Sequence, residues 1–195
     1  MRTIVREYNL YPVSELTTKS QEVAHQEWLM HKEYGYSGDN RATLTEFENA
    51  FNLSIRDWSY DSCGYYYSFF TDLSGDIEQM QGIRLATYII NNHWHKLFTP
   101  KSYWQGRKSR KSRVFVTSDC SLTGYCADQA VLEPIYKFFE RPNEHTTYYD
   151  LMDSCLDSFF KYCRDDMEYT EKLEYFIEES ENNEWEYLES GKIFC

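Results

Sequence analysis

The sequence predicts a single α+β domain in which several helices pack on a small antiparallel sheet. Two patterns indicate this class: apolar residues recur at helical spacing in several segments, and they alternate with period two in others. Of the 195 residues, 42% are hydrophobic and 18% aromatic, which is enough to bury one core. No Pro-rich or Ser/Gly-rich stretch divides the chain. We therefore expect one domain over residues 1–195.

The first part of the chain predicts two helices followed by a β-hairpin. Residues 15–34 are expected to form a helix because Thr18 and Gln21 have capping-box spacing ahead of an apolar stripe. Residues 42–52 repeat this pattern in a shorter helix. Alternating apolar and polar residues then predict a hairpin over residues 53–73, with its turn at YDSCG.

A longer helix is expected over residues 77–98, broken near Gly82 and stopped by Pro100. The basic stretch that follows is expected to be a loop, with a short strand at RVFVTSD. Helices are predicted over residues 128–139, 148–167 and, in an acidic segment, 170–181. The chain then predicts two short strands about a Ser-Gly turn in EWEYLESGKIF.

The charge of the chain falls into three blocks. Residues 1–78 hold 13 acids and 6 bases, residues 79–118 hold 8 bases and no acid, and residues 119–195 hold 19 acids and 6 bases. The net charge of −12 therefore hides a basic central segment between acidic ends. Five of the eight central bases lie in YWQGRKSRKSRVF, Tyr103 to Phe115.

Three interpretations of the basic segment stay open. In the first, it lies against the acidic C-terminal third of the same chain through many weak, screened pairs. In the second, it binds nucleic acid, with Lys and Arg on phosphates and with Tyr103 and Trp104 stacked on bases. In the third, the acidic surface of the chain occupies the nucleic-acid groove of a partner protein.

Two sets of residues are the candidate binding sites. The basic cluster consists of Lys101, Arg107, Lys108, Arg110, Lys111 and Arg113. The acidic-aromatic edge consists of Glu184, Trp185, Glu186 and Tyr187. Large aromatic residues among acids are more typical of a protein-binding edge than of a nucleic-acid site.

Candidates for a zinc site or a nucleophile are weak. His93, His95, Cys120 and Cys126 are zinc-ligand types, but in a helix the two histidines point about 200° apart. Either cysteine would need a positioned base, such as His93 or His145, to become a nucleophile. The chain has no GxSxG, Gly-rich phosphate loop or HExxH motif.

A carboxylate ladder is the remaining candidate. Asp150, Asp153 and Asp157 share one helix face, where they could hold magnesium or act as an acid and base pair. A solvated face is the commoner explanation, and Lys161 follows Asp157 at ion-pair spacing. We therefore predict no catalytic residue, no metal site and no cofactor.

The sequence also predicts a soluble, cytoplasmic protein. Its start, MRTIVREYNL, lacks the apolar run of a signal peptide, and no stretch approaches the roughly 18 apolar residues that cross a bilayer. The six cysteines include no CxxC pair, so we expect reduced thiols.

A resemblance to known proteins covers nearly the whole chain. It is carried by TTKSQEVA, TLTEFENAFN, GIRLATYIINN, DCSLTGYCADQAVLEPIYKFF, LMDSCLDSFFKYC and NNEWEYLESGKIF. These segments resemble a family of small acidic proteins carried by bacteriophages and mobile elements, whose members are often labelled antitoxin-like. The resemblance implies an accessory protein that binds a host component, and it carries over no catalytic residue.

The main functional hypothesis is a non-enzymatic phage or mobile-element protein that inhibits a bacterial defence effector, of anti-CRISPR or anti-restriction type, by stoichiometric association. Its expected partner is a host or defence-system protein or a nucleoprotein complex, and no membrane. The alternative is a nucleic-acid-binding antitoxin or regulator that uses the basic cluster. The third hypothesis is a metal-dependent hydrolase that uses the aspartate ladder.

Overall fold

The computed structural model describes residues 2, 4, 6–73, 75–105 and 107–194, and the side chains of residues 113–115 lie outside the described part. Contacts within the chain divide it into two compact units. Unit 1 comprises Met1–Tyr34 and Asp166–Cys195, and unit 2 comprises Gly35–Asp165. Each unit has a hydrophobic core of its own.

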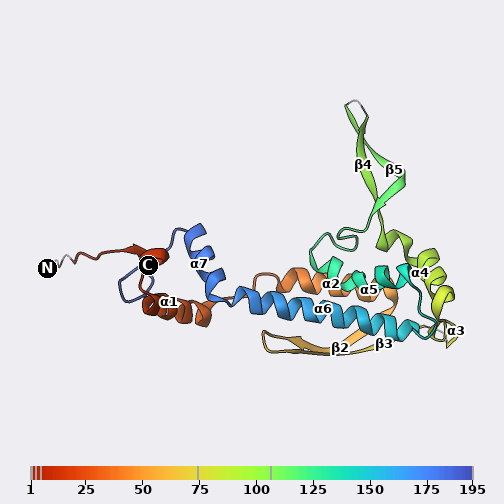
Figure 1. The fold of residues 1–195 in the computed structure, drawn as a ribbon, viewed down its shortest axis with the longest axis horizontal. Coiled ribbons are helices and arrows are strands. Elements are labelled where there is room, and N and C mark those ends of the chain that lie inside the picture. Colours follow the sequence, from red (N-terminus) through yellow and green to blue (C-terminus); the bar gives the residue numbers. More distant parts are fainter. Residues whose placement is uncertain (1, 3, 5, 74, 106, 195) are drawn as a thin grey trace. The chain divides into compact units, whose positions relative to one another are not determined.

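Helices build most of unit 2 (Figure 1). They are α2 (Ser37–Phe51), α3 (Gly75–Glu78), α4 (Gly82–Leu97), α5 (Ala127–Glu140) and α6 (Tyr148–Thr170), whose last turn belongs to unit 1. The longer helices each bury one apolar face, as their residue spacing predicts. The buried Tyr148 at the start of α6 donates a hydrogen bond of 2.6 Å to the Phe51 carbonyl at the end of α2. This bond ties two helix ends together inside the core.

The predicted β-hairpin in unit 2 is present. It consists of β2 (Leu53–Tyr60) and β3 (Tyr65–Thr71), paired antiparallel. Phe69 is buried and the ring of Tyr67 stacks on Phe160 of α6, whereas Tyr66 and Phe70 are exposed. This alternation shows that one face of the hairpin covers α6 and the other face is solvated.

The prediction of a loop in the basic segment is wrong. β4 (Thr99–Gln105) and β5 (Lys108–Thr117) form a second antiparallel hairpin. Residues 113–117 of the short strand predicted at RVFVTSD are the end of β5, and residues 118 and 119 follow it. Every residue of β4 is exposed. Because neither face of β4 enters a core, its sequence lacks the apolar alternation that marks a half-buried strand.

Unit 1 is a small assembly of two helices and a two-stranded ribbon. α1 (Thr18–His31) and α7 (Leu173–Asn182) accompany a 3-10 turn, η1 (Val13–Glu15), while β1 (Tyr11–Pro12) pairs with β6 (Glu186–Tyr187). Its core consists of Val13, Leu16, Ala24, Phe176 and Tyr187. The predicted C-terminal turn is present, since the Gly191 amide donates to the Leu188 carbonyl at 2.9 Å.

The α+β class is confirmed. Within the described ranges, seven α-helices accompany three two-stranded antiparallel sheets, so the strands form separate ribbons. The long helix expected over residues 77–98 is interrupted between α3 and α4, next to the predicted break at Gly82, whose φ is +56°. The single domain stays a prediction. No helix in the described part of the chain is long and apolar enough to cross a membrane.

Candidate functional site

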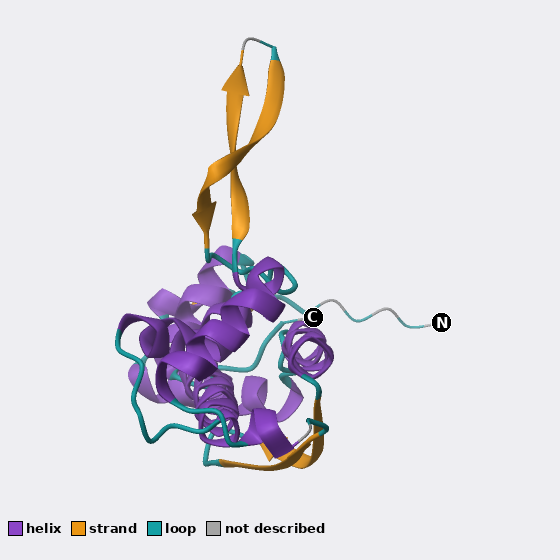
Figure 2. Ribbon diagram, turned by 90° about the vertical axis from the view of Figure 1, so that its right-hand side faces the viewer, coloured by secondary structure: helices purple, strands orange, loops and turns teal. Residues whose placement is uncertain are grey.

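The β4–β5 hairpin carries the basic cluster. Figure 2 shows it as a twisted ribbon that projects from the helices of unit 2. Its described cluster side chains, which are Lys101, Arg107, Lys108, Arg110 and Lys111, are all exposed, and Arg107 lies in the turn at the tip. Arg113 lies in β5, but its side chain is outside the described residues. The structure therefore brings bases that are spread over eleven positions onto one ribbon.

The strand register divides the hairpin into two faces, because opposite residues share a face and neighbours alternate. We name the faces by their aromatic residues. The tyrosine face holds the pairs Tyr103–Arg110 and Gln105–Lys108, and the tryptophan face holds the pairs Trp104–Ser109 and Ser102–Lys111. Each face thus combines one aromatic ring with at least one base.

Both aromatic rings of the hairpin are open to solvent. Trp104 is 76% exposed and Tyr103 is 48% exposed. Trp104 faces only the small side chain of Ser109 across the strand pair, which leaves the indole uncovered. An exposed ring beside bases suits stacking on a planar partner group better than it suits folding stability.

The five hairpin bases whose side chains are described form no ion pair with an acid among the described residues. The bases that form ion pairs within the described residues are Lys96, Lys137, Arg164 and Lys172. The interpretation of the basic segment as an internal clasp therefore has no ion pair to support it there.

The root of the hairpin is fixed to α5. The Tyr136 hydroxyl donates to the Leu97 carbonyl at 2.8 Å and lies 3.4 Å from the Ser118 carbonyl, so it meets the chain on both sides of the hairpin. Ser121 Oγ adds a bond of 2.8 Å to the Lys96 carbonyl. Hydrogen bonds therefore hold the root of the projecting strands in place.

The acidic-aromatic edge is only partly a surface. Tyr187 is 2% exposed, and its hydroxyl shares a hydrogen bond of 2.8 Å with Ser180, so its expected contact role is wrong. Trp185 is half-buried and packs on the core of unit 1. Glu184 and Glu186 are exposed, and their contact role stays a prediction.

An acidic stripe also lies on α7. Glu174, Glu178 and Glu181 are exposed and recur at spacings of four and three, so they lie on one face of the helix. Within the described residues these three form no ion pair. Unit 1 as a whole carries 15 acids and 6 bases, a formal charge of −9. Unit 1 therefore presents a negative surface.

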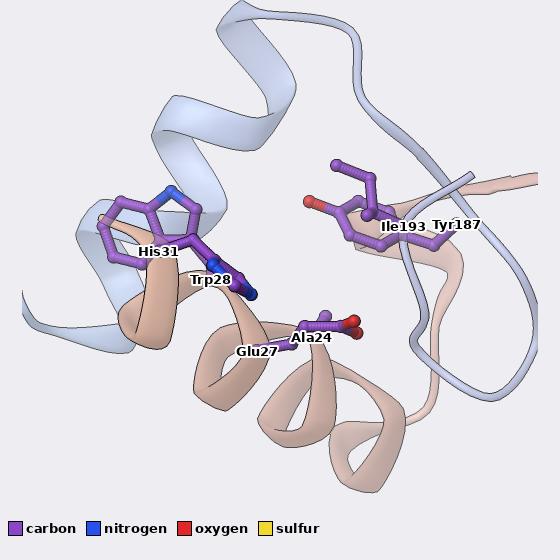
Figure 3. Close-up of a pocket in the computed structure, with 6 residues that line it drawn as sticks. All are labelled: Ala24, Glu27, Trp28, His31, Tyr187 and Ile193. Carbon is purple, nitrogen blue, oxygen red and sulfur yellow. The ribbon is translucent and has the colours of Figure 1, made fainter. Parts of the chain in front are cut away.

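Unit 1 also contains a cavity of about 260 Å³ (Figure 3). Its lining is mostly apolar and consists of Ala24, Glu27, Trp28, His31, Tyr187 and Ile193. The ring centroids of Trp28 and Phe176 lie 5.3 Å apart, and the Lys32 ammonium lies 5.0 Å from the centroid of the Trp28 ring. The polar side chains in the lining are Glu27, His31 and Tyr187, and the Tyr187 hydroxyl is bonded to Ser180.

The zinc candidates are not brought together. His93 is buried between Phe51 and Tyr88, whereas His95 is exposed, as the helical spacing predicts. Burial raises the pKa of the Cys120 thiol, which opposes a role as a nucleophile. No group of three or more His, Cys, Asp or Glu side chains within the described part of the chain could hold a metal ion.

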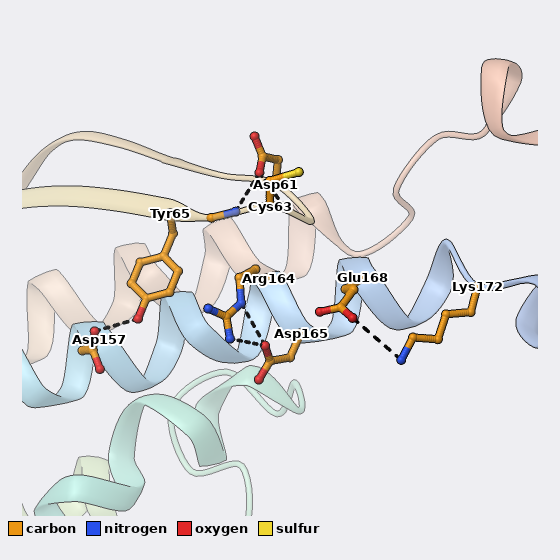
Figure 4. A network of polar contacts seen from close by, with 9 residues as sticks. Asp61, Cys63, Tyr65, Asp157, Arg164, Asp165, Glu168 and Lys172 are labelled. Carbon is orange, nitrogen blue, oxygen red and sulfur yellow. Dashed lines mark hydrogen bonds and ion pairs between the residues drawn. The ribbon is translucent and has the colours of Figure 1, made fainter.

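Two members of the aspartate ladder hold the β2–β3 hairpin to α6. Asp157 accepts a hydrogen bond of 2.7 Å from the Tyr65 hydroxyl (Figure 4), and Asp153 accepts one of 2.9 Å from Tyr67. Asp150 accepts from the amide and hydroxyl of Thr147 and caps the start of α6, which lowers its pKa. All three carboxylates thus have structural partners.

Sequence reasoning missed Tyr136 and the loop contacts of Asp128. Asp128 lies at the start of the helix predicted over residues 128–139, and its buried carboxylate accepts hydrogen bonds from the amides of Leu122, Thr123 and Gly124. It thereby orders the loop that leads from β5 back to α5. A tyrosine on an otherwise apolar helix face was the one signal for Tyr136, and it does not say which carbonyl the hydroxyl reaches.

No family model, curated protein or solved structure matches the chain. The resemblance to phage and mobile-element proteins therefore stays a prediction.

Proposed function

We propose that this protein is a non-enzymatic, cytoplasmic nucleic-acid-binding protein that uses the β4–β5 hairpin as its contact arm. The observation that carries the proposal is a projecting ribbon whose five described bases are exposed and lack ion-pair partners in the described residues. Phosphate contacts from Lys and Arg supply most of the affinity of such sites, and exposed rings add stacking.

The sequence context agrees with this role. Residues 79–118 hold no acid, so no negative charge within the segment opposes an approaching phosphate backbone. The rest of the chain has a net negative charge, which repels a nucleic acid. An arm that contacts the nucleic acid only along its own length suits this distribution of charge. Among the hypotheses drawn from the sequence, a nucleic-acid-binding role corresponds to an antitoxin or regulator.

Binding of a labelled oligonucleotide, measured at increasing salt, tests the proposal. We expect affinity to fall steeply with salt, with a slope near −0.9 for each phosphate contacted in a DNA duplex. The variant Arg107→Glu/Arg110→Glu/Lys111→Glu should lose binding. The charge-matched variant Lys19→Glu/Lys161→Glu/Lys192→Glu reverses three exposed bases outside the hairpin and should retain most of it. Equal losses in both variants would refute the assignment to the arm.

A second candidate function rests on the acidic stripe of α7. Exposed Glu174, Glu178 and Glu181 without ion pairs among the described residues suit a surface that occupies the nucleic-acid groove of a bacterial defence effector. This is the anti-restriction or anti-CRISPR role expected from the sequence, acting by stoichiometric association.

Phage plating on a host with an active restriction or CRISPR system tests this second function. Expression of the protein should raise plating efficiency, and Glu174→Gln/Glu178→Gln/Glu181→Gln should abolish that rise while the hairpin charge-reversal variant keeps it. A rise that depends on the hairpin and not on α7 would assign the effect to nucleic-acid binding instead.

A further inference from the structure

We infer that the β4–β5 hairpin enters the major groove of double-stranded DNA, with its tip toward the base edges and its two faces toward the groove walls. The inference rests on the proposed nucleic-acid binding and adds the class of nucleic acid and the docking mode. It follows from three properties of the hairpin: charge on both faces, length, and the side chains at the tip.

The distribution of charge over both faces is the first property. Lys108 and Arg110 lie on the tyrosine face, and Lys111 lies on the tryptophan face. A sheet that binds a single strand presents one face as a platform, so Lys and Arg side chains on its other face would meet no phosphate. Lys and Arg side chains on both faces are useful when phosphates lie on both sides, as they do for an element between the two backbones of a groove.

The dimensions of the hairpin are the second property. The B-DNA major groove is about 12 Å wide and about 8.5 Å deep, and it admits a two-stranded ribbon. The seven residues of β4 at about 3.4 Å each span about 24 Å. The tip therefore reaches the groove floor while the root at Tyr136 stays outside the duplex. The major groove of A-form RNA is too narrow for such an element.

The side chains at the tip are the third property. Gln105 ends β4 and Arg107 lies in the turn, so both come first into contact with base edges. Gln forms paired hydrogen bonds with adenine and Arg forms them with guanine in the major groove. The tip thus has base-reading chemistry, whereas Lys111 and Arg110 stand farther up the strands, at the level of the backbone.

The decisive experiment compares three labelled ligands with the full-length protein at one low salt concentration, by fluorescence anisotropy: a DNA duplex, one of its strands, and the RNA duplex of the same sequence. We expect the DNA duplex to bind at least tenfold more tightly than the other two. Tighter or equal binding of the single strand or the RNA would overturn the inference but leave the proposed function standing. Failure of all three to bind would remove the proposed function as well.

Single charge reversals then test the docking mode. Arg110→Glu on the tyrosine face and Lys111→Glu on the tryptophan face should each weaken duplex binding about tenfold, because each face meets a backbone. Lys161→Glu, on exposed surface of α6, is the matched control and should change affinity less than threefold. If only one face matters, the hairpin lies flat and groove insertion is wrong. Thermal unfolding of each variant should match that of the wild type, which checks that the variants remain folded.

Discussion

The Tyr136 hydroxyl donates a hydrogen bond of 2.8 Å to the Leu97 carbonyl, the last residue of α4 before β4 begins. The same hydroxyl lies 3.4 Å from the Ser118 carbonyl, just after β5 ends. One side chain of α5 therefore meets the chain where it leaves the helical body and where it returns. A two-stranded hairpin is marginally stable by itself in water, so a fixed root matters for its direction.

Replacement of Tyr136 by Phe should loosen this root without unfolding unit 2. Loss of the hydrogen bond should lower the free energy of unfolding by about 1 kcal/mol, because the Leu97 carbonyl loses a partly buried donor. Urea denaturation measures this change. Tyr125→Phe is the control, since Tyr125 is exposed, and should have almost no effect. Amide exchange in β4 and β5 should also speed up in Tyr136→Phe alone, and unchanged exchange would contradict the role of the root.

The two long hairpins show which strands a sequence can reveal. The β2–β3 hairpin was predictable because one face meets α6 and the other meets water, which produces the alternation of Leu53 and Ile55 with Ser54 and Arg56 in β2. β4 has water on both faces, so solvent imposes no alternation and the segment resembles a loop. Its pairing depends on backbone hydrogen bonds that no side-chain pattern records.

The candidate site was predictable where it depends on charge and not where it depends on burial. The bases of the hairpin were found by counting, since local density of Lys and Arg needs no fold. Tyr187 was assigned to a surface because an aromatic residue among glutamates has the same sequence pattern on either face of a strand. Its burial follows from packing with Phe176 and α1, which the local sequence does not encode.

Acid should destabilise unit 2 through His93. Burial lowers the pKa of His93 from its ordinary value of 6.5, and its Nε2 has no hydrogen-bond partner within the described residues. Because the unfolded chain binds this proton more readily, protonation costs the folded state stability. The free energy of unfolding is therefore unaffected by His93 above about pH 6.5 and falls as the pH drops from there to the lower folded pKa. Unfolding free energies measured from pH 7.5 to 5 should decline.

Two variants assign this acid sensitivity. His93→Phe should flatten the decline between pH 6.5 and 5, since the ring between Phe51 and Tyr88 then has no proton to take up. His95→Gln removes an exposed histidine two residues away and should leave the profile as it is. A decline of the same size in His93→Phe would show that other groups cause it.

The aspartate ladder should prove structural. Tyr67→Phe should lower the free energy of unfolding by about 1 kcal/mol, because Asp153 loses a donor at 2.9 Å. Tyr66→Phe, on the solvated face of the same strand, should cost almost nothing. A double-mutant cycle with Asp153→Ala, which removes the acceptor oxygen, should give a coupling energy of at least about 0.5 kcal/mol. Stabilisation of the wild type by Mg²⁺ would instead favour a metal site.

Gly191 should tolerate no side chain. Its φ is +89°, and an added Cβ would lie 2.2 Å from the Ser20 carbonyl oxygen in α1. The C-terminal turn and α1 approach this closely because Ser20 Oγ also donates to the Glu189 carbonyl at 2.7 Å. Gly191→Ala therefore combines a left-handed backbone with a backbone clash, and it should lower the free energy of unfolding by more than about 2 kcal/mol.

Gly38→Ala provides the comparison for that substitution, because an added Cβ at Gly38 meets nothing within 4 Å and the residue lies in α2. There the change should be neutral or stabilise the protein by up to about 1 kcal/mol, since alanine loses less backbone entropy on folding. Urea unfolding of both variants measures the difference. If Gly191→Ala and Gly38→Ala behave alike, the close contact between the C-terminal turn and α1 does not form in solution, and the core around Tyr187 would be open to solvent.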